Sequence, residues 1–151
     1  MTTTEFTQEN KPSQRKDNVV YTAKSHTTGG RDGGTSRTTD GRLAVTFSRP
    51  GAPGNGTNPE QLFAVGWSAC FISAMAIAAA KMKIALPPDT SIDAEVDVRI
   101  DADGYFLQTR LNVSLPGMER NLAQAVVDAG EQVCPYSKAT RGNIVVDINL
   151  V

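Results

Sequence analysis

Residues 58–81 read NPEQLFAVGWSACFISAMAIAAAK, and this stretch decides the fold. Asn58 is a good N-cap, Pro59 suits the first helical position, and Gln61 stands three residues after the cap, as in a capping box. No residue from 61 to 80 is charged. The stretch therefore predicts a long central helix that is apolar on every side, which is typical of a helix that is buried on all sides.

The same run is about as long as a membrane-spanning helix of roughly 20 residues. Much of it is Ala, Gly and Ser, which insert less readily than Leu or Ile, and no second span or aromatic belt accompanies it. We therefore interpret it as a core helix and expect no membrane partner. Because the short strands of one 151-residue chain can hardly enclose such a helix, a second subunit is its natural cover, and we expect a homodimer.

The remaining sequence predicts a single α+β domain over residues 18–151, preceded by a flexible tail over residues 1–17 that is polar and without periodicity. A glycine-dense turn, GGRDGGTS, occupies residues 29–36, and Asp103-Gly104 marks a hairpin. The alternation of apolar and polar residues and their helical spacing predict strands over residues 19–27, 42–47, 91–100, 105–115 and 144–151, and a second helix over residues 118–133.

The charge and composition of the chain exclude several functional classes. A net charge of −1 gives no electrostatic reason to expect nucleic acid as a partner. The N-terminal residues contain no apolar segment of the kind found in secretion signals, so we expect a cytoplasmic protein with reduced thiols. One His and two Cys are too few for a closed zinc site, although carboxylates could in principle complete one, and we expect no metal.

The two cysteines carry any sulfur chemistry that the chain performs. Cys70 lies within the apolar helix, in GWSACFISAMA, and Cys134 directly precedes a proline, in QVCPYSKATRGN. They are either a redox pair, in which one sulfur reacts and the other resolves, or two buried structural thiols that pack as small apolar side chains. The residues alone leave both interpretations open.

A reactive Cys70 would need a cation near its sulfur. Cys70 lies about a dozen residues past the N-cap, beyond the favourable end of the helix dipole, and burial would raise its pKa. Arg31 in GGRDG is the best-placed candidate, because the flanking glycines allow a close approach of the backbone. Glu60 could hold that arginine in bidentate geometry. Alternatively, Arg31 is a solvated loop residue and Glu60 complements the helix dipole.

Three segments in this order, GGRDG, TNPEQLFAVGWSACF and VCPYSKATRGN, resemble the organic hydroperoxide resistance (Ohr) proteins of the OsmC/Ohr superfamily, and the resemblance covers about residues 18–151. It implies an OsmC-like fold, with antiparallel sheets packed around a central buried helix in an intertwined homodimer. It also implies a thiol-dependent peroxidase of organic hydroperoxides, with Cys70 peroxidatic, Cys134 resolving, and Arg31 with Glu60 activating. No bound cofactor is expected, and the resemblance implies an external lipoyl dithiol, on a lipoylated protein, as reductant.

Two residues are expected to line the substrate pocket. An apolar environment around Cys70, to which Phe71 contributes, would favour alkyl or lipid hydroperoxides over hydrogen peroxide. Alternatively, Phe71 is a core residue, because it recurs with Trp67 and Met75 at spacings of four, which is more typical of core than of pocket. Tyr136 beside Cys134 either packs or lines the same pocket. Two alternative functions remain: a thiol redox sensor, and a small-ligand-binding dimer using the same cysteine pair.

The spacing along the helix leads to a further hypothesis about the site. Glu60 and Cys70 are ten residues apart, so an unbroken helix separates them by roughly 15 Å and turns them to different faces. Arg31 could then hardly reach both in one chain, unless the helix breaks at Gly66. We therefore expect an unbroken helix, and a site that combines Cys70 of one subunit with the Arg31–Glu60 pair of the other.

Overall fold

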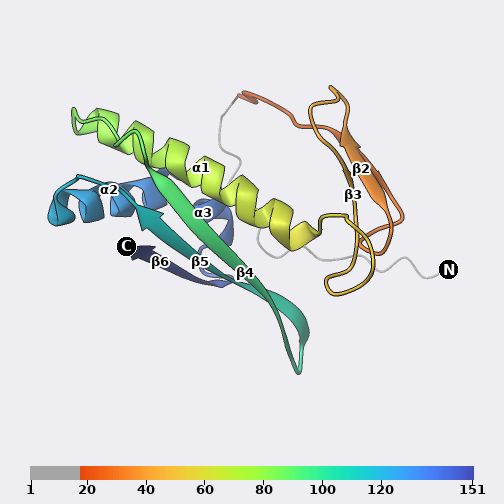
Figure 1. The fold of residues 1–151 in the computed structure, drawn as a ribbon. Coiled ribbons are helices and arrows are strands. Elements are labelled where there is room, and N and C mark those ends of the chain that lie inside the picture. The colour runs from red at the N-terminus through yellow and green to blue at the C-terminus, as the bar shows by residue number, and fades with distance from the viewer. Residues whose placement is uncertain (1–17) are drawn as a thin grey trace.

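The computed structural model describes residues 18–151, so the tail expected over residues 1–17 lies outside the described residues. Figure 1 shows one long helix with a sheet packed along it and a second, small sheet beyond the N-terminal end of the helix. In chain order the elements are β1 (Ser25–Thr28), β2 (Thr35–Thr38), β3 (Ala44–Thr46), α1 (Pro59–Lys81), β4 (Ser91–Asp101), β5 (Gly104–Ser114), α2 (Arg120–Val133), α3 (Pro135–Thr140) and β6 (Val145–Leu150). The α+β class and the central position of α1 are confirmed.

The two sheets differ in the direction of their strands. β1, β2 and β3 form an antiparallel sheet in that order, and β4 and β5 form the long antiparallel hairpin expected around Asp103-Gly104. β6, however, pairs with β5 in parallel. The expectation of antiparallel sheets throughout is therefore wrong for this pair. The physical reason is the connection: α2 and α3 carry the chain back along the sheet, which is the kind of crossover that parallel strands require.

The long helix begins as its sequence predicts. The Asn58 side chain accepts a hydrogen bond from the Gln61 backbone N–H at 2.8 Å, and Pro59 occupies the first turn. The Gln61 side chain accepts from the Thr57 hydroxyl at 2.8 Å, so the reciprocal bond of the cap goes one residue further back than a capping box would place it. α1 continues without a break through Gly66 to Lys81.

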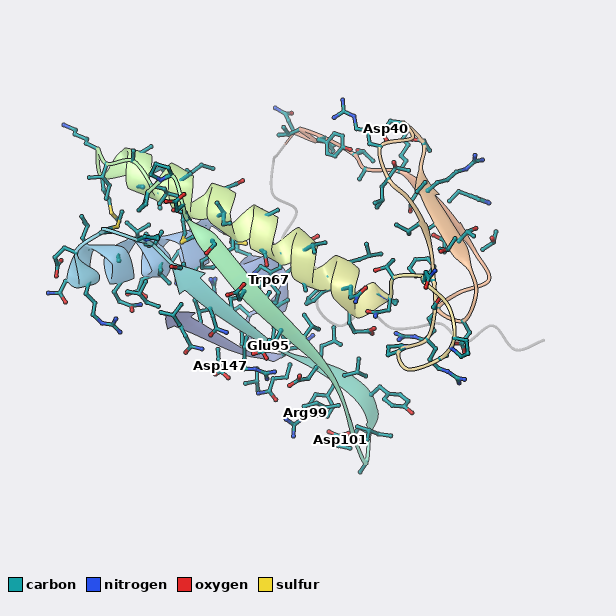
Figure 2. All side chains as sticks on the ribbon, in the orientation of Figure 1. Asp40, Trp67, Glu95, Arg99, Asp101 and Asp147 are labelled. Carbon is teal, nitrogen blue, oxygen red and sulfur yellow. The ribbon has the colours of Figure 1, made fainter. Side chains whose placement is uncertain are left out.

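The core forms where α1 meets β5 and α2. Fully buried side chains come from all three elements, and the largest are Trp67, Phe71 and Met75 of α1, Leu111 and Val113 of β5, and Val126 and Val127 of α2. Figure 2 shows Trp67 between α1 and the sheet, whereas Glu95 and Asp147 lie on the sheet's outer face. α1 and α2 approach closely at Gly130, where an added Cβ would stand 2.6 Å from the Met75 side chain.

One side of α1 is left uncovered by its own chain. Val65 and Ile77 are 64% and 51% exposed, although six other residues of the helix are buried. In the part of the chain that the structure describes, α1 is also the one helix with the length and composition to cross a bilayer. Because its buried side chains form the centre of the core, we describe it as the core helix of a soluble α+β fold.

Three local predictions differ from the observed elements. Val19 and Val20 are almost fully exposed and precede β1, so the first strand is shorter than expected and begins at Ser25. β2 lies at the end of the expected glycine-dense turn, and its sequence TSRT has no apolar alternation that would reveal a strand. α3 has six residues, which is too short for a helical period to be detected.

Candidate functional site

The two cysteine sulfurs meet between α1 and the junction of α2 with α3. The Sγ atoms of Cys70 and Cys134 are 3.7 Å apart and both thiols are free. Cys134 is fully buried and Cys70 is partly accessible. The backbone of Cys134 is fixed from both sides, because its N–H donates to the Gly130 carbonyl at 2.9 Å and its own carbonyl accepts from the Lys138 N–H at 3.0 Å. A small approach of the sulfurs would bring them to the roughly 2 Å of a disulfide.

The surroundings of Cys70 within one chain favour its protonated form. Burial raises the pKa of the Cys70 thiol, and the hydrogen bond with Cys134 raises it further. The backbone N–H of Tyr136 acts in the opposite direction and lowers this pKa. No cation is among these main contributions. Within residues 18–151, therefore, no positive charge is among the main contributions that would lower the pKa of this thiol.

The second cluster is the ion pair of Arg31 with Glu60. The Arg31 Nη2 and Nη1 atoms donate to the two carboxylate oxygens of Glu60 at 2.9 and 3.2 Å. Arg31 lies in the turn between β1 and β2, where Gly30 and Gly33 adopt positive φ angles of 64° and 79° that only glycine tolerates easily. The hydrogen bond from Arg31 lowers the pKa of Glu60, and the hydrogen bond to Glu60 raises that of Arg31, so both groups stay charged.

The structure therefore brings the four predicted residues together in pairs. Cys70 meets Cys134, and Arg31 meets Glu60, but the unbroken α1 keeps Glu60 and Cys70 about 15 Å apart along its axis. Arg31 is held by the first turn of the helix, while the sulfurs lie near its middle. Each chain thus holds the Cys70–Cys134 thiol pair and the Arg31–Glu60 ion pair at separate places along α1.

The two residues expected to line a pocket have different environments. Phe71 is fully buried in the hydrophobic core, so its prediction as a pocket residue is corrected: it packs inside the chain. Tyr136 is 36% exposed. Its ring stacks on Trp67 with centroids 6.3 Å apart and meets the edge of Phe63 at 6.0 Å.

Sequence reasoning missed the aromatic support of Tyr136. Phe63, Gly66 and Trp67 lie seven, four and three residues before Cys70, and this spacing places them on one face of a helix with it. The signal was therefore present in the sequence. The contact with Tyr136 could not be recognised from this spacing, because α3, which carries Tyr136, was not predicted.

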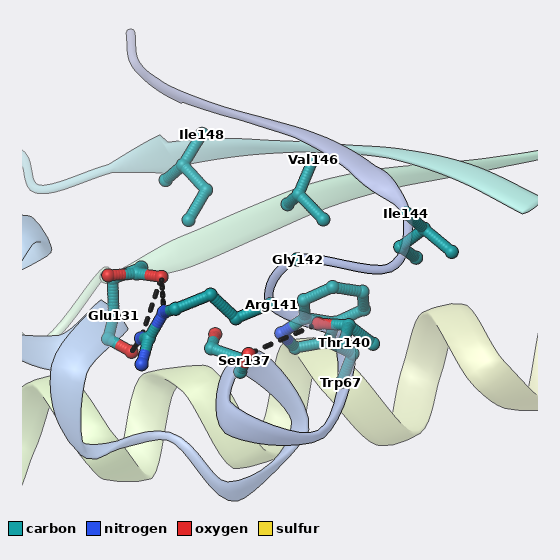
Figure 3. A pocket seen from close by; sticks show the side chains of 9 residues that line it. All are labelled: Trp67, Glu131, Ser137, Thr140, Arg141, Gly142, Ile144, Val146 and Ile148. Carbon is teal, nitrogen blue, oxygen red and sulfur yellow. Dashed lines mark hydrogen bonds and ion pairs between the residues drawn. The ribbon is translucent and has the colours of Figure 1, made fainter. Parts of the chain in front are cut away.

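A separate cavity of about 300 Å³ lies between α3 and β6. Figure 3 shows the ion pair between Arg141 and Glu131, 2.9 Å long, beside the apolar side chains of β6. The residues that line the cavity are Trp67, Glu131, Ser137, Thr140, Arg141, Gly142, Ile144, Val146 and Ile148. Neither cysteine is among them. Across residues 18–151, no three His, Cys, Asp or Glu side chains come together as metal ligands would.

Comparison with known proteins finds a family model and relatives that are similar to this chain. The family model described as OsmC-like protein matches residues 52–149. The organic hydroperoxide resistance protein of Xanthomonas axonopodis pv. citri is 45% identical over 135 residues, which cover 87% of this chain and 95% of that protein.

Solved structures agree with the sequence relatives. The crystal structure of the organic hydroperoxide resistance protein OhrB of Bacillus subtilis is similar with a TM-score of 0.82 and 38% identity, and covers 88% of this chain and 100% of that chain. A crystal structure of an organic hydroperoxide resistance protein from Legionella pneumophila has a TM-score of 0.82 at 39% identity, covering 88% and 98%.

Proposed function

The chain belongs to the OsmC/Ohr family, and from that premise we propose that it is a cysteine-dependent peroxidase that reduces organic hydroperoxides to alcohols. The observation that carries the proposal is the 3.7 Å separation of the Cys70 and Cys134 sulfurs. Two free thiols at this distance, one partly accessible and one buried, have the arrangement that a reacting and a resolving sulfur need. The names of the relatives supply the substrate class.

The reaction has three steps. The Cys70 thiolate attacks one oxygen of the hydroperoxide, the O–O bond breaks, and the alkoxide takes up a proton and leaves as the alcohol. The sulfur is then a sulfenic acid. The Cys134 sulfur attacks the Cys70 sulfur, the S–O bond breaks, and water leaves as the disulfide forms. An external dithiol finally reduces the disulfide, and we propose a lipoyl group on a partner protein for this role.

Arg31 is proposed to supply the missing cation. Near Cys70 it would stabilise the thiolate and the alkoxide that develops as the O–O bond breaks. Glu60 orients the guanidinium through two hydrogen bonds, and it stays away from the sulfur because a nearby negative charge would raise the Cys70 pKa. This role for Arg31 requires a homodimer in which the Arg31–Glu60 ion pair of one subunit lies beside the Cys70 and Cys134 sulfurs of the other. The exposed apolar side of α1 supports that assembly.

Tyr136 is proposed as a wall of the hydroperoxide pocket, because the residue is partly exposed and its backbone N–H is hydrogen-bonded to the Cys70 sulfur. An aromatic wall favours alkyl or lipid chains over hydrogen peroxide, which has no apolar part to bury. We place the reaction in the cytoplasm, where the thiols are kept reduced.

The proposal is tested by following consumption of cumene hydroperoxide at steady state, with dihydrolipoamide or with reduced thioredoxin as the electron donor. We expect many turnovers per Cys70 with dihydrolipoamide, few with thioredoxin, and none in Cys70→Ser. A redox sensor would instead consume one equivalent and stop. Cysteines that react with neither hydroperoxide nor an alkylating agent would leave the small-ligand-binding dimer as the remaining function.

A further inference from the structure

Gly66 has no backbone reason to be glycine. It lies inside the long helix α1, and it is not among the glycines with positive φ. Apart from proline, glycine is the least favourable residue in a helix interior, so its presence weakens α1. An explanation must therefore come from the space around its Cα.

That space is occupied by Tyr136. A Cβ built on Gly66 would stand 2.8 Å from the Tyr136 hydroxyl oxygen and 3.4 Å from the ring carbon that carries it. The first distance is shorter than real Cβ contacts, so the hydroxyl would have to move, whereas the second lies at the short limit of ordinary van der Waals contact. The tyrosine ring rests above the bare backbone of Gly66, between Trp67, on which it stacks, and Phe63, which it meets edge-on. We call Phe63, Gly66 and Trp67 the tyrosine seat.

The seat is connected to the sulfur chemistry through a short piece of chain. Tyr136 follows Cys134 by two residues, and the rigid Pro135 lies between them. On the other side, Gly66 precedes Cys70 by four residues, one turn of the same helix. The packing of the ring on Trp67 and against Phe63 resists rotation of the side chain alone, and a displacement passed on to the Tyr136 backbone would move the Cys134 sulfur relative to the Cys70 sulfur.

We propose that Gly66 is a positioning residue for disulfide formation: by leaving room for the Tyr136 side chain, it holds Cys134 at bonding range of Cys70. This inference rests on the proposed function. It concerns the second step, in which the Cys134 sulfur bonds to the Cys70 sulfur, the S–O bond of the sulfenic acid breaks, and water leaves. A step between two groups held by the protein depends steeply on their placement, and a shift of about 1 Å can cost as much as 100-fold in rate.

The test enlarges residue 66 and shortens the side chain of residue 136, separately and together. One equivalent of cumene hydroperoxide is mixed with wild type, Gly66→Ala, Tyr136→Phe and the double variant. Samples are quenched with an alkylating agent, and mass spectrometry counts sulfenic acid and disulfide over time. Gly66→Ala should form the disulfide at least about tenfold more slowly. In the double variant the hydroxyl that meets the new Cβ is gone, so disulfide formation should return to the rate of Tyr136→Phe alone.

Rescue separates positioning from a general effect on the helix, because alanine strengthens the helix equally in both backgrounds. A wild-type rate in Gly66→Ala, or a slow rate that Tyr136→Phe does not restore, would overturn the inference while leaving the peroxidase intact. If Gly66→Ala does not fold, the double variant still decides: it should fold and match Tyr136→Phe, and failure of either refutes the seat. A wild type that forms no disulfide would instead refute the proposed function itself.

Discussion

Cys70 and Cys134 have different roles in the proposed cycle because they differ in access. Cys70 is partly exposed and Cys134 is fully buried behind it. We expect Cys70→Ser to lose all hydroperoxide consumption, since the remaining thiol cannot meet the substrate. Cys134→Ser should consume one equivalent and then stall or overoxidise, because a sulfenic acid without a partner thiol proceeds to sulfinic acid. Single-turnover consumption followed by mass spectrometry measures both. Loss of the first turnover in both variants would contradict the assignment.

Arg31 is expected to set the acidity of Cys70. Removing a nearby cation raises the pKa of a thiol, so in Arg31→Ala the midpoint of Cys70 alkylation against pH should move to higher pH, and hydroperoxide attack near pH 7 should slow. Arg31→Lys should recover only part of the rate, because an ammonium group lacks the planar fork that binds both Glu60 oxygens. Alkylation rates are measured in Cys134→Ser to isolate Cys70. An unchanged midpoint would remove Arg31 from the mechanism.

At the residue scale, the sequence predicted the ion-pair partner of a charged side chain better than the burial of an apolar one. The bidentate partner of Arg31 could be inferred, because a guanidinium fork and a first-turn carboxylate have matching geometry. For Phe71 the sequence held two indications: its spacing of four from Trp67 and Met75 favoured the core position that the structure shows, whereas its place next to Cys70 favoured the pocket. Which face of α1 meets β5 depends on residues far along the chain.

Among the elements, α1 and α2 pack closely against each other at Gly130. Gly130 of α2 approaches Met75 of α1 so closely that a Cβ would stand 2.6 Å from the Met75 Cγ and 3.2 Å from its Cα. The backbone atoms cannot move away as a side chain can, so Gly130→Ala should destabilise the fold by about 1–3 kcal/mol through overpacking. Urea unfolding measures this. Gln132→Ala, an exposed change in the same helix, is the matched control and should stay within about 0.5 kcal/mol.

The elements could be predicted where their signals were local. The N-cap Asn58, the apolar run after it and the Asp103-Gly104 hairpin all lie within a few residues of what they determine. The parallel pairing of β6 with β5 could not be predicted in this way, because it depends on how the path of α2 and α3 returns the chain to the sheet. The short α3 had no period to detect.

The whole molecule is expected to assemble each site from two chains. Mixing Cys70→Ser with Arg31→Ala under conditions that exchange subunits should restore activity, because one of the two sites in the mixed dimer then holds every wild-type residue. Each parent alone should be nearly inactive. Peroxidase activity is measured before and after subunit exchange. The control is a sample of Cys70→Ser alone that is taken through the same exchange procedure. Mixtures that gain nothing, although exchange is shown by mass spectrometry, would mean that each chain carries a self-contained site.

The distance between the two sulfurs along the chain has an entropic consequence. Cys70 and Cys134 are 64 residues apart in sequence although their sulfurs nearly touch. A bond between them would close a long loop in the unfolded chain and reduce its freedom, which raises the free energy of unfolding by about 4 kcal/mol in the chain-entropy description. Each catalytic cycle would then form and break this cross-link, and the stability of the fold would rise and fall with it. Calorimetry should find the oxidised protein markedly more heat-resistant than the reduced one, so that hydroperoxide itself protects the protein until the reductant arrives.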